Sequence, residues 1–146
     1  MSNIIVQKFG GTSVGSVERI DAVADIIKNA SLSEKIVVVV SAMSGETNKL
    51  VSLAKHFGDN PDKREFDALV STGETISSAL LTMALHSKGV KARSFSATQI
   101  SMKTTSTYSK AKILDVDSNK IMSVIENDTI PIITGFQGVT ETGDIT

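Results

Sequence analysis

Positions 37–40 hold four consecutive valines, and such a run fits few structures other than a buried β-strand. A strand that is apolar at every position has both faces covered, as the central strands of parallel sheets do. The apolar segment 4–9 precedes it, and apolar residues recur between them with helical spacing over residues 17–27. Strand, helix and strand in this order predict a right-handed βαβ unit. Segment 4–9 is also expected to be a buried strand.

The rest of the chain continues the alternation of helices and strands. Helical spacing predicts further helices around 50–57, 66–70, 76–84 and 121–125, and short apolar runs predict strands at 92–96, 113–116 and 129–134. Pro131 is unusual for a central strand, because proline cannot donate to the ladder. Residues 99–112 are weakly patterned and fit a loop, a flap or short edge strands equally well. This order predicts an α/β protein with a mainly parallel sheet.

Composition excludes several classes of function. With 146 residues, 40% of them hydrophobic, the chain can form one domain with a core. A formal net charge of −1 gives no basic surplus for nucleic acid. The longest apolar run, 36–40, is too short to cross a membrane, and the first residues do not resemble a signal peptide. Cysteine is absent, which fits the cytoplasm, and His56 and His86 have no partner at metal-ligand spacing, so no metal site is predicted.

A glycine-rich turn follows the first predicted strand. It consists of Lys8, Phe9, Gly10, Gly11, Thr12 and Ser13. Adjacent glycines lack Cβ atoms, so an anion can approach their N–H groups, and the helix that follows adds unpaired N–H groups of its own. Lys8 places a positive charge beside them. These features suit a phosphate-binding turn, although a Gly-Gly pair is often only a tight turn and Lys8 could be a solvated charge.

Polar residues also follow the other predicted strands or begin helices. Ligands of an open parallel sheet collect beyond the carboxyl ends of its strands, and Ser41, Thr47, Glu74 and segment 135–138 could all lie there. Ser41 and Thr47 could instead be turn hydroxyls that satisfy nearby backbone groups. Glu74 could simply complement the dipole of a helix N-terminus. Alternatively, its carboxylate could accept hydrogen bonds from an ammonium group.

Four blocks of this sequence resemble aspartate kinases, which belong to the amino-acid kinase family. They are 8–14 (Lys-Phe-Gly-Gly-Thr-Ser-Val), 41–48 (Ser-Ala-Met-Ser-Gly-Glu-Thr-Asn), 71–74 (Ser-Thr-Gly-Glu) and 135–138 (Gly-Phe-Gln-Gly). Their order and spacing match the family over essentially the whole chain. The Met-Ser-Gly-Glu form of the second block is more similar to monofunctional enzymes than to fused kinase–homoserine dehydrogenases. The resemblance implies the three-layer αβα sandwich of the amino-acid kinase fold.

The resemblance also implies a reaction and its participants. ATP, with Mg²⁺, would phosphorylate the β-carboxylate of L-aspartate to give 4-phospho-L-aspartate, the first step of lysine, threonine and methionine biosynthesis. Lys8 would stabilise the phosphoryl group in flight, which is the electrostatic help that phosphoryl transfer needs. Gly10 and Gly11 would bind phosphate oxygens, with Phe9, Thr12 and Ser13 beside them. Ser41 and Thr47 would contact aspartate or phosphate, and Glu74 would hold the aspartate α-ammonium.

The family pattern continues beyond this sequence. Family members run on into an Arg-Gly-Gly-Ser-Asp-like segment, the adenine site and ACT regulatory domains, none of which is present in residues 1–146. The chain is therefore expected to be the N-terminal part of a kinase catalytic domain from a homo-oligomeric enzyme, and to be inactive alone. Two alternatives remain open: a kinase for another acidic amino acid, and a non-catalytic phosphate-binding or interaction module.

Overall fold

The computed structural model describes residues 3–146, which form six strands and five helices. The strands are β1 (Ile4–Phe9), β2 (Lys35–Val40), β3 (Ala92–Phe95), β4 (Lys103–Thr104), β5 (Ile113–Asp115) and β6 (Ile130–Thr134). The helices are α1 (Val17–Ala30), α2 (Glu46–Lys55), α3 (Lys63–Val70), α4 (Thr72–Ser87) and α5 (Ser118–Glu126). Every helix and strand expected from the sequence is present, with ends that differ by a few residues.

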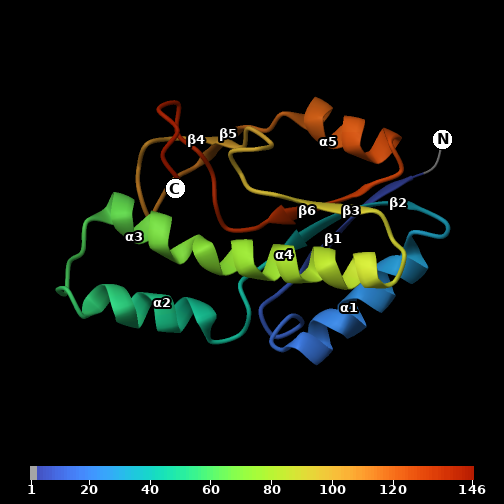
Figure 1. Ribbon diagram of the computed structural model, residues 1–146. Helices are drawn as coiled ribbons and strands as arrows, with labels where there is room; N and C mark the ends of the chain where they lie inside the picture. Colours follow the sequence, from blue (N-terminus) through green and yellow to red (C-terminus); the bar gives the residue numbers. More distant parts are fainter. Residues whose placement is uncertain (1–2) are drawn as a thin grey trace.

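The main sheet is four-stranded and parallel, with the order β1-β2-β6-β3. β1, α1 and β2 form the predicted βαβ unit, which Figure 1 shows at the side of the molecule that carries the N-terminus. Lys8 lies beside Val39 and Phe9 beside Val40, and Val40 lies beside Thr134 of β6. These three strands therefore end at the same level, and their following loops emerge at one edge.

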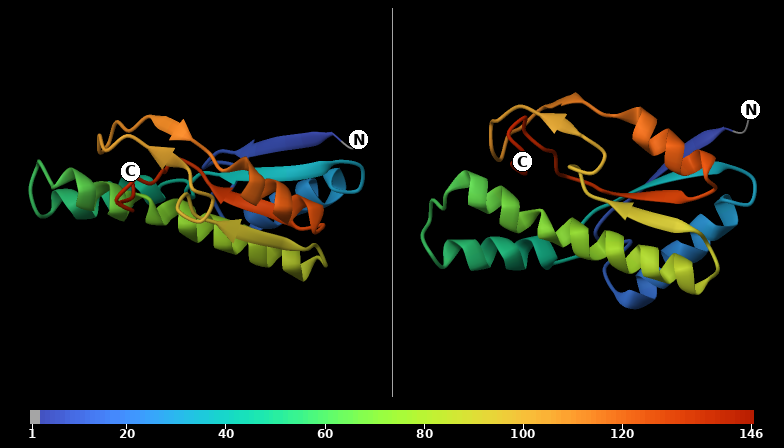
Figure 2. Two further views of the ribbon diagram at one scale, coloured as in Figure 1. Left: turned by 90° about the horizontal axis from the view of Figure 1, so that it is seen from above. Right: turned by 45° about the horizontal axis from the view of Figure 1, so that its top comes forward.

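The sheet is the middle of three layers, as Figures 1 and 2 show. One apolar cluster packs α1 and α4 against one face, through Ile20, Ile27, Val38, Leu81, Leu85 and Ile132. A second cluster covers the other face with α5 and the segment after β3, through Val37, Phe95, Ile100, Ile125 and Ile133. The valine run supplies both clusters, because alternate side chains of a strand point to opposite faces. The αβα sandwich is thus confirmed.

β1 differs from the expectation of a buried strand. Within residues 3–146 it pairs only with β2 and forms an edge of the sheet. Ile4, Ile5 and Val6 are 45%, 40% and 64% exposed. The sequence could not predict this exposure, because a strand has the same apolar pattern whether or not another part of the protein covers it.

β6 lies in the middle of the sheet despite Pro131. The N–H of Ile130 donates to Lys91 O, on the β3 side. Successive residues of a strand direct their N–H groups to opposite sides, so the nitrogen of Pro131 faces β2. The ladder with β2 begins only at Ile132. The missing donor of Pro131 therefore costs no ladder bond.

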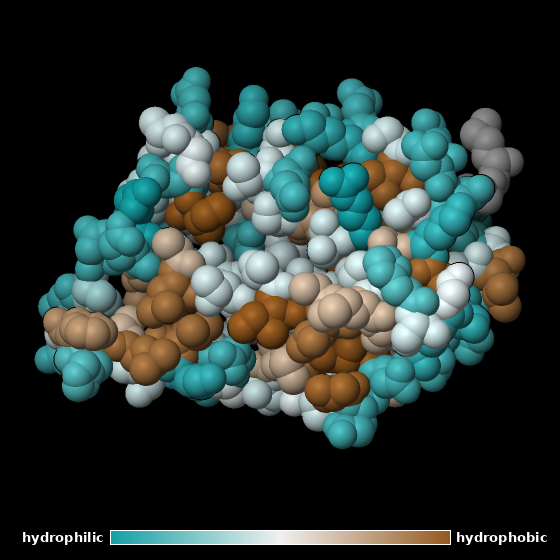
Figure 3. Space-filling view, viewed as in Figure 1, coloured by the Kyte–Doolittle hydropathy of each residue, from teal (hydrophilic) through white to brown (hydrophobic). Residues whose placement is uncertain are grey.

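α3 and α4 form one long helical stretch that is interrupted only at Ser71. By length and composition alone, this stretch (Lys63–Ser87) meets the requirements of a membrane-spanning helix. Core helices of soluble proteins can meet the same requirements, and 44% of the apolar window of this stretch is buried. α2 and α4 leave Leu53, Ile76 and Met83 exposed on their outer sides. Figure 3 shows apolar side chains gathered over these helices.

The weakly patterned segment folds as a turn followed by a small two-stranded sheet. β4 pairs antiparallel with β5, and the loop between them carries Tyr108. The predicted turn at 141–144 forms a hairpin, in which Thr140 N donates to Asp144 O and Gly143 has a φ of +91°. Asp144 accepts hydrogen bonds from Arg64 Nε at 2.7 Å and from the Tyr108 hydroxyl at 3.0 Å. Three segments far apart in the sequence are joined at this carboxylate.

Candidate functional site

The glycine turn after β1 is tight and leaves donors free. Gly10 O accepts hydrogen bonds from the N–H groups of Ser13 and Val14. Within residues 3–146, the N–H groups of Gly11 and Thr12 donate to no protein acceptor. A Cβ at Gly10 would meet nothing within 4 Å, so this side of the turn is open. The turn therefore presents bare N–H groups at a surface that an anion can reach.

The loop after β2 packs directly on this turn. Ser44 N donates to Gly11 O at 3.1 Å, and a Cβ at Gly11 would lie only 2.9 Å from Ala42 O. Glycine is required here because the two backbones approach so closely. The loops after β1 and β2 are therefore neighbours, as the sequence predicts.

Ser41 and Thr47 are both half-buried in this second loop and its helix. In the described part of the chain, neither hydroxyl makes a hydrogen bond, although Ser41 uses its backbone N–H to bind Phe9 O and its carbonyl to accept from Ser77 Oγ at 2.6 Å. Neither hydroxyl therefore acts as a local turn cap within the described structure. Both remain free to bind a ligand.

Glu74 lies in the first turn of α4 and is only 4% exposed. Its Oε1 accepts a hydrogen bond from Ala42 N at 3.2 Å. Its Oε2 is buried and has no partner among the described residues. Ala42 thus connects the carboxylate to the glycine turn, and one carboxylate oxygen is left for a donor that the protein does not supply.

The pKa of Glu74 is raised, chiefly because burial penalises the charged form, while the Ala42 N–H opposes the shift. A carboxylate that only complemented a helix dipole would lie in solvent at the helix end. The burial of Glu74 instead resembles that of groups at functional sites, where burial and missing partners shift pKa values.

The other residues predicted for the first loop occupy different environments. Lys8 is exposed and forms no ion pair or hydrogen bond within residues 3–146. It lies on the sheet face opposite Phe9, whose side chain packs against the core cluster of α1 and α4. Phe9 therefore offers a ligand only its backbone. Thr12 is exposed and Ser13 is half-buried.

Two residues to which the sequence analysis gave no individual role hold the site together. Gln137 is buried; its Nε2 donates to Ser71 O at 3.2 Å and its Oε1 accepts from Ala97 N at 3.4 Å. Ser77 Oγ ties α4 to Ser41 O. The available signal for Gln137 was its position in the glycine-flanked segment 135–138 after a strand, and the sequence holds no comparable signal for Ser77.

Phe136, beside Gln137, has an unusual backbone and surface position. Its φ is +57°, a left-handed conformation that costs a residue with a Cβ free energy, and its side chain is 87% exposed. Strained and exposed aromatic residues of this kind occur at ligand-binding sites. It lies near the start of the loop that follows β6, at the same sheet edge.

Together the loops after β1, β2 and β6 and the first turn of α4 offer bare N–H groups, a free ammonium, two free hydroxyls and a buried carboxylate with one unpaired oxygen. The N–H groups and the ammonium suit phosphate oxygens, and the carboxylate suits a cationic group. Residues 3–146 contain no cluster of three or more His, Cys, Asp or Glu that could hold a metal ion. The arrangement can therefore hold an anionic and a cationic group side by side.

Comparisons with known proteins identify the family of the chain. The model of the amino acid kinase family matches residues 3–146. The aspartate kinase of Pseudomonas putida is 51% identical over 144 residues, which cover 98% of this chain and 35% of that relative. The structure of aspartate kinase from Synechocystis is 40% identical, with a TM-score of 0.79 over 94% of this chain and 22% of that chain.

A second solved structure shows the same fold at lower identity. Aspartokinase III of E. coli, in complex with aspartate and ADP, has a TM-score of 0.87 at 22% identity, covering 99% of this chain and 43% of that chain. The chain thus spans about a third of the length of its Pseudomonas relative.

Proposed function

Since this chain belongs to the amino acid kinase family and is homologous to aspartate kinases, we propose that it supplies the phosphate-binding turn and the ammonium-binding carboxylate of an aspartate kinase. The whole enzyme transfers the γ-phosphoryl group of ATP to the β-carboxylate of L-aspartate. A reaction that consumes ATP fits the cytoplasmic location expected from the absence of cysteine.

The observation that carries this proposal is the unpaired oxygen of Glu74. A buried carboxylate with one unsatisfied oxygen is costly. An α-ammonium group would supply the missing donor and a compensating charge. This favours a substrate with a free amino group and disfavours an N-acetylated acidic amino acid.

The glycine turn would hold the phosphates of the nucleotide. The bare N–H groups of Gly11 and Thr12, and the open backbone of Gly10, can bind equatorial oxygens. Lys8 would neutralise charge on the transferring group, and Ser13 would add a hydroxyl. Catalysis here requires alignment and charge stabilisation rather than a covalent intermediate.

The backbone of Ser41 joins the end of β1 to α4, through Phe9 O and Ser77 Oγ. The free hydroxyls of Ser41 and Thr47 would contact aspartate or the transferred phosphate. Mg²⁺ would accompany ATP and be held mainly by phosphate oxygens, because residues 3–146 offer no acidic cluster for it. The metal would reduce repulsion between the nucleotide and the attacking carboxylate.

Calorimetric titration with matched ligands tests the proposal. L-aspartate carries an α-ammonium group that succinate lacks, so the chain should bind aspartate more tightly than succinate. Glu74→Gln should weaken the binding of aspartate by at least about tenfold and leave the affinities for succinate and ADP unchanged. Equal affinities for aspartate and succinate in the unaltered chain would contradict the role of Glu74.

Lys8→Ala tests the phosphate half of the site. The variant should weaken ADP binding by about five- to tenfold without altering the unfolding free energy, since Lys8 is exposed and has no partner in the described structure. Lys91→Ala is the matched control, because Lys91 is also exposed and directly precedes β3 at the opposite end of the sheet. Equal losses in the two variants would argue against a specific role for Lys8.

A non-catalytic phosphate-binding module is the second candidate. The observation that favours it is the open glycine turn, whose bare N–H groups can bind phosphate without any contribution from Glu74. We expect the 146-residue chain alone to show no aspartate-dependent release of ADP in a coupled assay. ADP binding without any preference for aspartate over succinate would favour this candidate over the kinase.

A further inference from the structure

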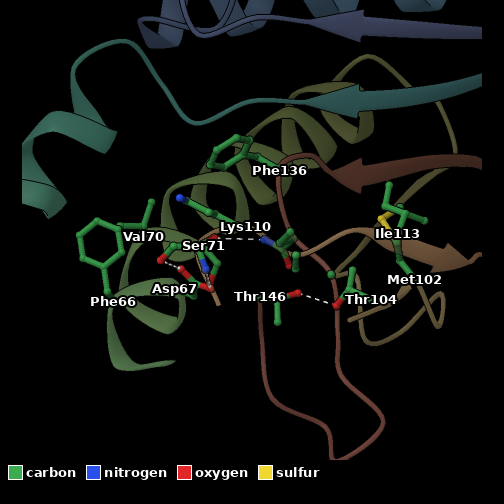
Figure 4. A pocket seen from close by; sticks show the side chains of 14 residues that line it. Phe66, Asp67, Val70, Ser71, Met102, Thr104, Lys110, Ile113, Phe136 and Thr146 are labelled. Atoms are coloured by element: carbon green, nitrogen blue, oxygen red, sulfur yellow. Dashed lines mark hydrogen bonds between the residues drawn. The ribbon is translucent and has the colours of Figure 1, made fainter. Parts of the chain in front are cut away.

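A cavity of about 390 Å³ lies between α3, the β4–β5 segment and the loop that follows β6, as Figure 4 shows. Its apolar walls come from Phe66, Val70, Met102, Ala111, Ile113 and Phe136. This volume lies in the range of pockets that hold small organic molecules. Ser71, Phe136 and Gln137 also line it, whereas Lys8, Gly10, Gly11 and Glu74 do not, so the cavity adjoins the proposed phosphate and ammonium sites but does not include them.

Hydrogen bonds between distant segments hold the walls in place. The carboxylate of Asp67 accepts from Ser109 N at 2.6 Å and from Ser109 Oγ at 2.9 Å, which fixes the loop between β4 and β5 on α3. The hydroxyls of Thr104 and Thr146 are 2.6 Å apart. These bonds tie the cavity walls to one another, so the cavity exists before any ligand arrives.

Lys110 gives the cavity its electrostatic character. It follows the anchored Ser109, it lines the cavity, and Figure 4 shows its side chain between α3 and Phe136. Within residues 3–146 its ammonium makes no ion pair or hydrogen bond. Asp67 is the other charged side chain of the lining, and its carboxylate is held by the two hydrogen bonds from Ser109. Lys110 is therefore the charged side chain of the lining whose charged group has no partner in the described structure.

We propose that this cavity binds a small organic anion with a flat apolar body. The body lies against Phe66, Ile113 and Phe136, where it removes apolar surface from water. The anionic group faces the ammonium of Lys110, which has no competing partner. Neither an apolar molecule without charge nor an inorganic anion would satisfy both parts of the cavity.

The test uses 2-naphthoate and its neutral analogue 2-naphthamide as probes, with ¹⁵N-labelled chain and two-dimensional NMR. We expect saturable shift changes at the amides of residues 109–113 and 136–138, and naphthoate should bind about fivefold more tightly than the amide. Lys110→Glu should abolish this preference. Lys112→Glu makes the same charge change two residues away, outside the lining, and should preserve it.

Three results would overturn the proposal. Naphthoate and naphthamide could bind equally, which would remove the role of the cation. The shift changes could centre on the exposed apolar residues of α2 and α4 instead of the cavity. Finally, Lys110→Glu and Lys112→Glu could reduce the preference equally, which would show a general effect of net charge. The spectra of both variants also report whether they are folded.

Discussion

The single residue on which the proposed site depends most is Glu74. Its carboxylate is buried at the start of α4, bonded through one oxygen to Ala42 N and unpaired at the other. A folded protein tolerates such a group when a ligand completes it, and the cost is borne by the ligand-free state. Stability and ligand binding should therefore respond in opposite directions when the charge of Glu74 is removed.

The raised pKa of Glu74 gives this expectation a pH dependence. Between the ordinary pKa of 4.5 and the raised value, the folded chain binds a proton more readily than the unfolded chain, so the unfolding free energy falls as pH rises through that window. Glu74→Gln removes this loss. Urea titrations should show that the variant gains stability relative to the unaltered chain between pH 4 and pH 7. If the difference in unfolding free energy between the two chains were the same at both pH values, burial of Glu74 would not raise its pKa.

Gly10 and Gly11 are neighbours with opposite steric surroundings. Ala at position 10 meets open space, so Gly10→Ala should change the unfolding free energy by less than about 0.5 kcal/mol while its methyl group hinders an approaching phosphate. Ala at position 11 would press on Ala42 O, so Gly11→Ala should cost about 1–3 kcal/mol.

Chemical denaturation and ADP titration of both glycine variants provide the measurement, and each variant is the control for the other. Equal stability losses would show that the two loops can move apart without cost. Unchanged ADP affinity in Gly10→Ala would argue that phosphate does not approach the turn from its open side.

At the level of elements, α4 is positioned by its first turn. Gly73 lets this turn approach the loop after β2, because a Cβ there would lie 2.8 Å from the Cβ of Ala42. Ser77 Oγ binds Ser41 O further along the helix, and Gln137 binds Ser71 O just before it. The start of α4 is therefore attached to the loops after β2 and β6, and Glu74 is placed by both.

Gly73→Ala should lower the unfolding free energy by about 1–3 kcal/mol, because two methyl groups would then occupy one space. The combined Gly73→Ala and Ala42→Gly variant moves the methyl group from one side of the contact to the other and should recover part of the loss. Thermal denaturation of the two single variants and the double variant measures this coupling. Strictly additive losses would mean that the helix does not press on Ala42.

At the level of the molecule, the sheet ends in an open edge. β1 pairs on one side only, and it carries exposed apolar side chains together with unpaired backbone groups. Such an edge is a template for another strand. We therefore expect the 146-residue chain to self-associate through β1.

Val6→Lys places a charge on this edge, where Val6 is 64% exposed, and should shift the chain from assemblies towards monomers. Leu32→Lys is the matched control, because Leu32 is 82% exposed in the turn between α1 and β2. Light scattering at two concentrations, tenfold apart, measures the change. A chain that stays monomeric at both concentrations, or two variants that behave alike, would contradict association through the edge.

The sequence by itself determined the order of strands and helices. It also determined the sheet edge at which the loops after β1, β2 and β6 meet the start of α4. These features follow from local signals: the valine run, the helical spacing of apolar residues, and the glycines that end strands. A parallel sheet then brings the loops together without further information. The candidate residues Gly11, Ser41 and Glu74 were identified for this reason.

Only the tertiary structure decided which residues are paired and which are left free. Glu74 meets Ala42 across 32 positions of sequence, and Gln137 meets Ser71 across 66. The exposure of β1 and the cavity beside Lys110 likewise depend on which segments become neighbours. Burial and hydrogen-bond partners are properties of contacts between distant segments, and no local pattern of residues specifies them.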